Sequence, residues 1–328
     1  MEIIGKFLEF GVAVEATRGT AKTVAEKWIK NVTANLTTKA EHAIDDNSHG
    51  VLSDSDNRRV IKKSIEGSVE GIVDANAIGY LMYNLYGSVV SSNVAGSIHS
   101  HVFTISNVIE HPSLSFFVKD GGAQQLVFNN GMVNSLEINA TPDDFIRFSA
   151  SLMASEEADN TDTTDYESAL DFVGKDVNVK IADTEAGLAT AEVVKAKDLG
   201  ITFDQGLIAD YVVGNYSPDD IYTSKMSIEG SFTKNFSDET YKDLFTGDVS
   251  KYMEIVIEGS QDLGSENHPT ITILLNNIRV TGWDRSGGND ELVTESIEFK
   301  AFYNVTDEQQ FEVTLQNLIA EYDDPASM

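Results

Sequence analysis

Apolar and polar residues alternate along most of the chain, and stretches with a helical spacing are few. Alternation sends successive side chains to opposite faces, as a β-strand with one buried and one solvated face requires. The pattern predicts strands at residues 31–38, 58–73, 101–106, 113–119, 124–139 and 145–154 in the first half, and at 176–182, 191–203, 224–233, 251–258, 270–283 and 291–303 in the second. The chain is therefore expected to be mainly β.

Helical spacing is clearest at residues 75–86. Apolar residues recur there at i, i+3, i+4 and i+7, namely Ile78, Leu81, Met82 and Leu85. Asp74 precedes this stretch as a candidate N-cap, and Gly87 follows it as a stop signal. One amphipathic helix is therefore predicted to pack on a sheet in the first half.

Three further segments are less regular. Residues 239–245, preceded by Asp238, predict a short helix, and residues 21–29 predict another. The C-terminal segment fits two patterns, because residues 311–315 alternate as a strand does while the apolar positions between 311 and 322 also fit a helix. The alternation and the β-branched residues favour the strand.

A five-residue motif occurs twice. Residues 64–68 read Ser-Ile-Glu-Gly-Ser, and residues 227–231 repeat these letters 163 positions later (227 minus 64). Around the motif, Thr37 is echoed by Thr202, and Asn129-Asn130 by Asn276-Asn277 at the shorter offset of 147 (276 minus 129). An order that is kept while the spacing drifts predicts a duplicated domain, with extra residues in the first copy.

The predicted boundary between the copies is acidic. Five carboxylates and no large apolar side chain lie between residues 156 and 165, a composition typical of a linker. With 328 residues the chain is long enough for two domains of about 150 residues each. We therefore expect a first domain with an N-terminal arm at 1–156, an acidic linker at 157–172 and a second domain with a C-terminal arm at 173–328.

Charge and composition narrow the function classes. Asp and Glu outnumber Lys and Arg by 53 to 23, and the resulting net charge of −30 argues against a protein that grips nucleic acid through its phosphates. Cysteine is absent, so disulfides and thiolate metal sites are excluded. Because no signal peptide and no apolar run near the ~18 residues of a membrane span are found, we expect a soluble chain without membrane anchoring.

The usual catalytic motifs are missing from the sequence. It contains no phosphate-binding loop, no Gly-x-Ser-x-Gly elbow and no His-Glu-x-x-His pair. His99 and His101 share a strand face but have no third ligand nearby in sequence, and the acidic run 159–165 lacks the glycine of a calcium loop. Trp28 and Trp283 are expected in packing rather than in base stacking. We therefore predict no enzyme, no metal and no cofactor.

Several short motifs, taken in order, carry a resemblance that covers residues 8–304. They are Glu15-Ala16-Thr17-Arg18-Gly19-Thr20-Ala21, Ile65-Glu66-Gly67-Ser68, the helix end 81–87 followed by His101-Val102-Phe103-Thr104, Pro112-Ser113-Leu114-Ser115, and Asn130-Gly131-Met132-Val133-Asn134-Ser135-Leu136. In this order they resemble the tail tube proteins, or major tail proteins, of long-tailed phages and archaeal tailed viruses, in a tandem-duplicated form.

The resemblance implies a fold and an assembly. The expected fold is two tandem β-sandwich domains, each with a short flanking helix, plus extended arms. The expected function is a virion structural protein whose rings stack into the hollow tail tube of a siphovirus, through which DNA is ejected without specific binding. Three chains would form a pseudo-hexameric ring, with a homohexamer as the alternative.

The implied partners and location follow from that function. They are the chain itself, the tape-measure protein, the tail terminator and the distal tail or baseplate proteins. The chain is expected in the virion tail, and in the host cytoplasm during assembly.

Candidate functional residues fall in two groups. Polar alternation predicts a face that lines the lumen, or alternatively a merely solvated outer face, formed by Glu66, Ser68, Glu70, Glu229, Ser231 and Glu298. The resemblance implies an assembly arm containing Phe10, Glu15, Arg18, Gly19 and Thr20. Residues 3–25, 45–57 and those after 304 are expected to become ordered only on docking, so that a chain lacking residues 2–20 would still fold.

Two other function classes stay open on the sequence. Another β-rich virion or surface protein, such as a capsid decoration, baseplate or S-layer component, would share the composition without forming a hollow ring. An acidic β-rich hydrolase or carbohydrate-binding module would need an exposed aromatic row or a carboxylate pair in one cleft, and the sequence has no clear instance of either.

Overall fold

The computed structural model describes residues 4–45, 50–52, 54, 55 and 57–322. The strands of the first half are β1 (Leu8–Val14), β2 (Lys27–Ile29), β3 (Val32–Ile44), β4 (Arg58–Ile72), β5 (Gly87–Ala95), β6 (Ile98–Ile105), β7 (Leu114–Asp120), β8 (Gln124–Ala140), β9 (Arg147–Ala154) and β10 (Glu156–Asp159). The strands of the second half are β11 (Val177–Ala182), β12 (Ala196–Asp204), β13 (Leu207–Asp210), β14 (Asp220–Thr223), β15 (Ser227–Asn235), β16 (Lys251–Glu258), β17 (Thr270–Ser286), β18 (Thr294–Ala301) and β19 (Phe311–Asn317). The helices are α1 (Ile78–Tyr86), α2 (Glu185–Leu188) and α3 (Thr240–Gly247), with 3-10 turns at Gly5–Phe7 and Gly174–Asp176.

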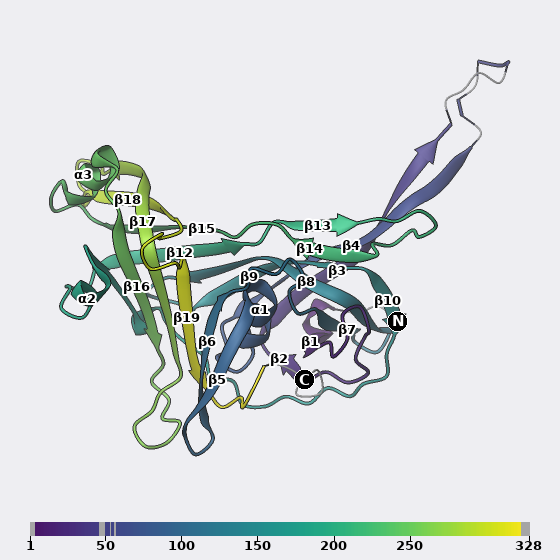
Figure 1. Cartoon of the computed structure of the whole chain (residues 1–328), viewed down its shortest axis with the longest axis horizontal. Coiled ribbons are helices and arrows are strands. Elements are labelled where there is room, and N and C mark those ends of the chain that lie inside the picture. The colour runs from purple at the N-terminus through teal and green to yellow at the C-terminus, as the bar shows by residue number, and fades with distance from the viewer. Residues whose placement is uncertain (1–3, 46–49, 53, 56, 323–328) are drawn as a thin grey trace.

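Strands from both halves form one continuous antiparallel layer. Its order is β3-β4-β9-β8-β12-β15-β18-β17, and the pairing of β8 with β12 joins the halves. In Figure 1 the layer runs across the molecule, and the β3–β4 hairpin projects from one end of it. We call it the joint sheet.

A second layer packs behind the joint sheet. In the first half it has the order β10-β8-β7-β1-β2, and in the second half β5-β6-β19-β17-β16-β11. The 17-residue strands β8 and β17 belong to both layers, because their first parts pair in the second layer and their last parts in the joint sheet. Each half is thus a pair of stacked sheets with an apolar core between them.

The two halves pair their strands in the same register. Thr37 of β3 lies opposite Glu66 of β4, and Thr202 of β12 lies opposite Glu229 of β15. The β8–β9 ladder shifts between Val133 and Ser135, and the β17–β18 ladder shifts at the positions 147 residues later, between Val280 and Gly282. These parallels support the predicted duplication, which itself stays a prediction.

The halves also share one core. The β5–β6 hairpin of the first half pairs with β19 of the second, and a single cluster of buried side chains extends through both halves. The segment between them is packed as well, since Lys27 pairs with Glu167 at 2.6 Å. The division into two domains and a linker stays a prediction, and the structure adds that the halves are joined by strand pairing.

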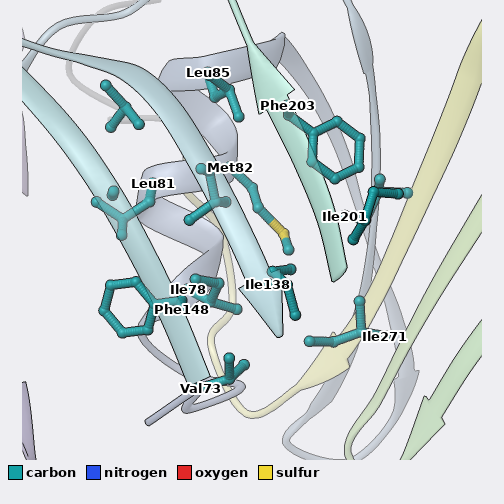
Figure 2. Close-up of a cluster of buried hydrophobic side chains, with 14 of the residues drawn as sticks. Val73, Ile78, Leu81, Met82, Leu85, Ile138, Phe148, Ile201, Phe203 and Ile271 are labelled. Carbon is teal, nitrogen blue, oxygen red and sulfur yellow. The ribbon is translucent and has the colours of Figure 1, made fainter. Parts of the chain in front are cut away.

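Helix α1 lies at the centre of this common core. Figure 2 shows Met82 of the helix turned toward Ile138 of β8 and Ile201 of β12, with Leu81 on the side of Phe148 and Leu85 on the side of Phe203, so that both halves contribute to the surroundings of the helix. All three helix side chains are fully buried. The predicted helix is confirmed, but it begins at Ile78, and its N-cap is Ala77 and not Asp74. Gly87 ends it with a left-handed backbone, φ 78°.

Two other predictions about segments are confirmed. The short helix expected at 239–245 is α3, Thr240–Gly247. The C-terminal segment forms the strand β19, whose alternate side chains are fully buried. Within the described residues, no helix is long and apolar enough to cross a membrane.

The helix expected at residues 21–29 is wrong. Residues Lys27–Ile29 form β2, which pairs with β1 so that Trp28 lies opposite Gly11. A helix this short has little stability of its own, so burial of Trp28 against β1 decides the conformation. The acidic stretch 156–165, predicted to be a linker, begins with the strand β10, Glu156–Asp159, whose four residues are exposed.

The N-terminal arm is not a free segment. Strand β1 pairs with β7 over its whole length, and Phe10 and Val12 are fully buried. The expectation that residues 3–25 are unstructured before docking is therefore wrong for residues 4–25. The same expectation for the residues after 304 is wrong for β19, which pairs with β17 and β6 and buries Phe311, Val313 and Leu315. Residues 46–49, 53, 56 and 323–328 of the expected arms lie outside the described residues.

Candidate functional site

The predicted polar side chains share one face of the joint sheet, which we call the polar sheet face. Ser231 of β15 lies directly opposite Glu298 of β18, and Glu66 of β4 lies opposite Thr37. Residues two apart on one strand point to the same side, so Ser68 and Glu70 accompany Glu66 and Ser231 accompanies Glu229. The structure thus brings together on one surface all six residues predicted for the lumen.

The opposite face of the same strands is apolar. Ile65 and Val69 of β4, and Ile228 and Phe232 of β15, are buried in the common core. Each strand of the repeated motif therefore has one face in the core and one face exposed. Neighbouring strands extend the same polar surface across both halves. That this surface lines a lumen, and is not merely a solvated outer face, stays a prediction.

The first four residues of the repeated motif have structural reasons. The isoleucine fills the core, and the first serine donates a hydrogen bond to the glutamate, at 3.1 Å for Ser64 Oγ to Glu66 Oε1 and 3.4 Å for Ser227 Oγ to Glu229 Oε1. The glycine allows a close approach, because a Cβ at Gly67 would overlap the backbone of Asn35 and one at Gly230 would lie 2.6 Å from the Gly200 carbonyl oxygen.

Two shallow hollows mark the polar sheet face, one in each half. The hollow in the first half is lined by residues of β3, β4, β8 and β9, including Asn35, Thr37, Glu66, Ser68 and Ser151. The hollow in the second half is lined by residues of β8, β12, β15, β17 and β18, including Glu137, Thr202, Glu229, Ser231 and Glu298. Their linings are mainly polar, unlike a small-molecule site, which is mostly apolar with a few placed polar groups.

Sequence reasoning missed several members of this face. Glu137 and Asn139 of β8 lie opposite Thr202 and Gly200 of β12, at the seam between the halves. The alternation of residues 136–140 contains the signal that would have found Glu137. No sequence signal indicates that β8 and β12 are neighbours, because that follows from the packing of the two halves.

The two halves differ in charge at equivalent positions. Lys300 of β18 lies opposite Glu229 and its Nζ donates to Glu229 Oε1 at 2.6 Å. This hydrogen bond and the positive charge of Lys300 lower the pKa of Glu229 below its usual value. Opposite Glu66 the first half has Met153, and Glu66 has no ion-pair partner among the described residues.

The predicted assembly residues of the N-terminal arm make contacts inside the chain. Glu15 accepts hydrogen bonds from Ser113 Oγ at 2.6 Å, Ser115 Oγ at 3.0 Å and the Asn130 backbone N–H at 2.9 Å. Burial raises the pKa of the Glu15 carboxyl, and these hydrogen bonds partly offset the rise. Gly19 also donates its backbone N–H to Glu15, at 2.8 Å.

Arg18 ties three segments together. Its Nε donates to Asp220 at 2.7 Å, and its other nitrogens donate to the carbonyl oxygens of His111 and Ile221. The arm is thereby fixed to the β13–β14 hairpin of the second half. An assembly role for Phe10, Glu15, Arg18, Gly19 and Thr20 stays a prediction, while their structural role within the chain is clear.

The two strand histidines lie side by side, with ring centroids 6.4 Å apart, but they differ in burial. His101 is fully buried, where its Nδ1 lies 2.8 Å from Ser91 Oγ and its Nε2 lies 3.1 Å from Asn317 Oδ1. His99 lies near the turn of the β5–β6 hairpin beside Asn93. Across the described ranges, no group of three or more His, Asp or Glu side chains is arranged to hold a metal ion.

Comparisons with known proteins identify the family. The sequence model described as phage tail tube protein matches residues 9–301. A search of curated proteins found no match. Among solved structures, a chain of the SPP1 tail tube is similar at 14% identity, with 46% of this chain and 81% of that chain covered and a TM-score of 0.32. Because the family model spans nearly the whole sequence, the chain belongs to the phage tail tube protein family and is a structural protein of the virion tail.

Proposed function

We propose that three chains close a ring in which their joint sheets form one barrel, and that the polar sheet face lines its channel. Each chain contributes eight strands to the joint sheet, so three chains give 24 strands. The rings would stack into the hollow tube that conducts viral DNA from the capsid to the host cell. The observation that carries this proposal is the continuous sheet, polar on one face and apolar on the other.

The unpaired ends of the joint sheet support ring closure. In the described part of the chain, β3 pairs with β4 alone, and the last part of β17 pairs with β18 alone. An open strand edge exposes unpaired backbone N–H and C=O groups, and closing a barrel removes such edges. A second copy of the chain offers the complementary edge for each end.

The dimensions of the barrel favour three chains over six. With strands about 4.8 Å apart, 24 strands give a barrel diameter of about 37 Å between backbones before strand tilt widens it. Six chains would give 48 strands and about twice that diameter, because barrel diameter grows roughly linearly with strand number. The matching registers of the two halves are what a threefold ring with pseudo-sixfold symmetry requires.

The chemistry of the polar sheet face suits the passage of DNA. Glu66, Glu70, Glu137, Glu229 and Glu298 place carboxylates on this face, where they would repel the phosphate backbone. Weak adhesion lets a long polymer slide through a channel without being held. Specific binding of DNA is therefore not expected.

Stacking and terminal partners complete the proposal. The β3–β4 hairpin extends well beyond the body of the chain (Figure 1), and Ile44 and Ile61 are exposed on it. We assign to it the contact with the next ring. Tape-measure, tail terminator and distal tail or baseplate proteins would meet the inside and the two ends of the tube, after assembly in the host cytoplasm.

Electron microscopy of the purified protein tests the ring. We expect end-on views with a central hole and six similar lobes that alternate with threefold symmetry. Six identical chains in a ring would keep the tube and contradict the stoichiometry. Solid fibres or flat sheets would contradict the barrel itself.

A further inference from the structure

We propose that β17 of one protomer pairs with β3 of the next protomer, in the register that β8 and β12 have inside the chain. Lys39 on β3 then forms an ion pair with Glu298 and Asp284 of the protomer that contributes β17. We call this ion pair the lock, because it stabilises the correct register. The inference rests on the ring proposed above. Beyond the ring, it specifies the register of the β17–β3 contact between protomers and the charges that distinguish this contact from the β8–β12 contact inside a chain.

The junction inside the chain supplies the register. Glu137 of β8 lies opposite Thr202 of β12. The matching ladder shifts put Asp284 of β17 in the place of Glu137, 147 positions later. Thr37 of β3 takes the place of Thr202, because both lie opposite the glutamate of the repeated motif. Asp284 of one protomer therefore faces Thr37 of the next.

Antiparallel pairing then fixes the neighbouring positions. Two residues along each strand from the Asp284–Thr37 pair, Gly282 faces Lys39 in one direction and Ser286 faces Asn35 in the other. Lys39 and Asn35 are exposed in the single chain, as expected for residues that await a partner strand. The polar members of both edges stay on the polar sheet face.

The charges at this junction are complementary. Glu298 lies opposite Gly282 on β18, and its carboxylate lies over the glycine, because a Cβ there would be 2.5 Å from Glu298 Oε2. In the proposed register Lys39 reaches Gly282 from the other side, with Asp284 as its diagonal neighbour. Among the described residues, none of Lys39, Asp284 and Glu298 has an ion-pair partner within the chain.

The internal junction has no such lock. In the place of Lys39 it has Asp204, which lies opposite Ser135, and Glu137 is the diagonal neighbour. Chain connectivity keeps that junction together, so it needs no attraction between charges. A contact between separate chains gains partner choice and correct register from complementary charges.

Cysteine cross-linking tests the register, because the natural chain has no cysteine. In assembled rings, oxidation of the double variant Asn35→Cys with Ser286→Cys should link protomers into covalent dimers and trimers. Directly opposite residues have Cα atoms about 4.5–5.5 Å apart, within the range of a disulfide. The matched controls Thr33→Cys or Thr37→Cys, each with Ser286→Cys, are shifted by two residues and should cross-link at least about tenfold less, since their Cα atoms lie roughly 8 Å apart.

Charge reversal tests the lock. Lys39→Glu should raise the protein concentration needed for ring formation roughly tenfold or more, because like charges then meet at the junction. The double variant Lys39→Glu with Glu298→Lys should recover most of the loss. Lys197→Glu makes the same change of charge at an exposed position on β12 outside the junction, and should assemble like the natural chain.

The outcomes separate this inference from the ring itself. Rings that form without the Asn35–Ser286 link, or that link the shifted pairs equally well, overturn the register and leave the ring. A Lys39→Glu variant that assembles as readily as Lys197→Glu overturns the lock. If the natural chain forms neither rings nor tubes even when a starter complex is supplied, both proposals are overturned.

Discussion

Helices α1 and α3 occupy the same place in the two halves, between the repeated-motif strand and the next strand of the second layer, yet they differ in burial. Eight of the nine residues of α1 are buried, whereas Tyr241 is the one buried residue of α3. The second half covers α1, because the Tyr86 ring packs 5.3 Å from Phe203 and 4.9 Å from Phe311 between ring centroids. In the described chain no third unit covers α3.

The cores beneath the two helices differ in polarity, with the more apolar core in the first half. In the first half Phe148 of β9 is buried among apolar side chains. At the position 147 residues later the second half has Glu295, fully buried, which accepts from Lys234 Nζ at 3.0 Å and from Trp283 Nε1 at 2.9 Å. The core of the first half is apolar at this position and is covered by the second half. The core of the second half contains the buried Glu295–Lys234 ion pair, and it lies at the end of the joint sheet where a neighbouring protomer is proposed to bind.

Removal of residues 2–20 should have the largest effect of all the changes and should destabilise the first half more than the second. It deletes β1, which pairs with β7 and β2 and buries Phe10 and Val12, so we now expect the first half to unfold. Amide hydrogen exchange should show loss of protection in β7 and retained protection in β16. Uniform protection in both halves would contradict the role given to β1.

Truncation of one leucine in each helix should sharpen the contrast. Leu85→Ala leaves a cavity in the sealed core and should lower the free energy of unfolding by about 2–5 kcal/mol. Leu244→Ala in α3 removes a half-buried side chain and should cost less than about 1 kcal/mol in the isolated chain. Urea titration measures both changes, and equal losses would mean that α3 is as well packed as α1.

Loss of the Glu295–Lys234 ion pair in the second half should lower the free energy of unfolding by an intermediate amount. Glu295→Gln leaves the Lys234 ammonium, 13% exposed, without its counter-charge, and should cost about 1.5–3 kcal/mol, the usual value of a hydrogen bond to a charged group. Glu298→Gln, an exposed change three positions along β18, is the matched control and should be nearly neutral in the single chain. Thermal unfolding compares the two variants. A neutral Glu295→Gln would show that the pair is not needed to hold Lys234.

The smallest effect concerns the charge difference on the polar sheet face. The folded-state pKa of Glu229 is lowered by Lys300, so its small contribution to stability is present above the unfolded pKa and is lost as the pH falls through the folded pKa. Glu229 is 61% exposed, so the contribution should be well under 1 kcal/mol.

Lys300→Met gives Glu229 the neighbour that Glu66 has in the first half, Met153. NMR titration of the Glu229 carboxyl should then show its pKa rise toward the usual value. An unchanged pKa would mean that the serine hydrogen bond, and not Lys300, sets it.

Much of this structure was predictable from the alternation in the sequence. Strands β4, β15 and β19 and helix α1 follow patterns that local geometry imposes, because a strand with one wet face must alternate and a buried helix must repeat every three to four residues. The six residues predicted for one polar face do share it. The predictions that were wrong concern short segments, such as 21–29. There the intrinsic preference for a helix is weak, and contacts with strands distant in the sequence determine the conformation.

By itself the sequence determined the β class, the repeated motif and the polar face, since these depend on periodicity and composition along single strands. Only the tertiary structure decided that β8 pairs with β12, that Arg18 joins the arm to the second half, and that α1 is sealed while α3 is open. Those features arise from contacts between residues far apart in the chain. A pattern read along one strand carries no information about which strand lies beside it, because edges pair through the backbone groups that every residue shares.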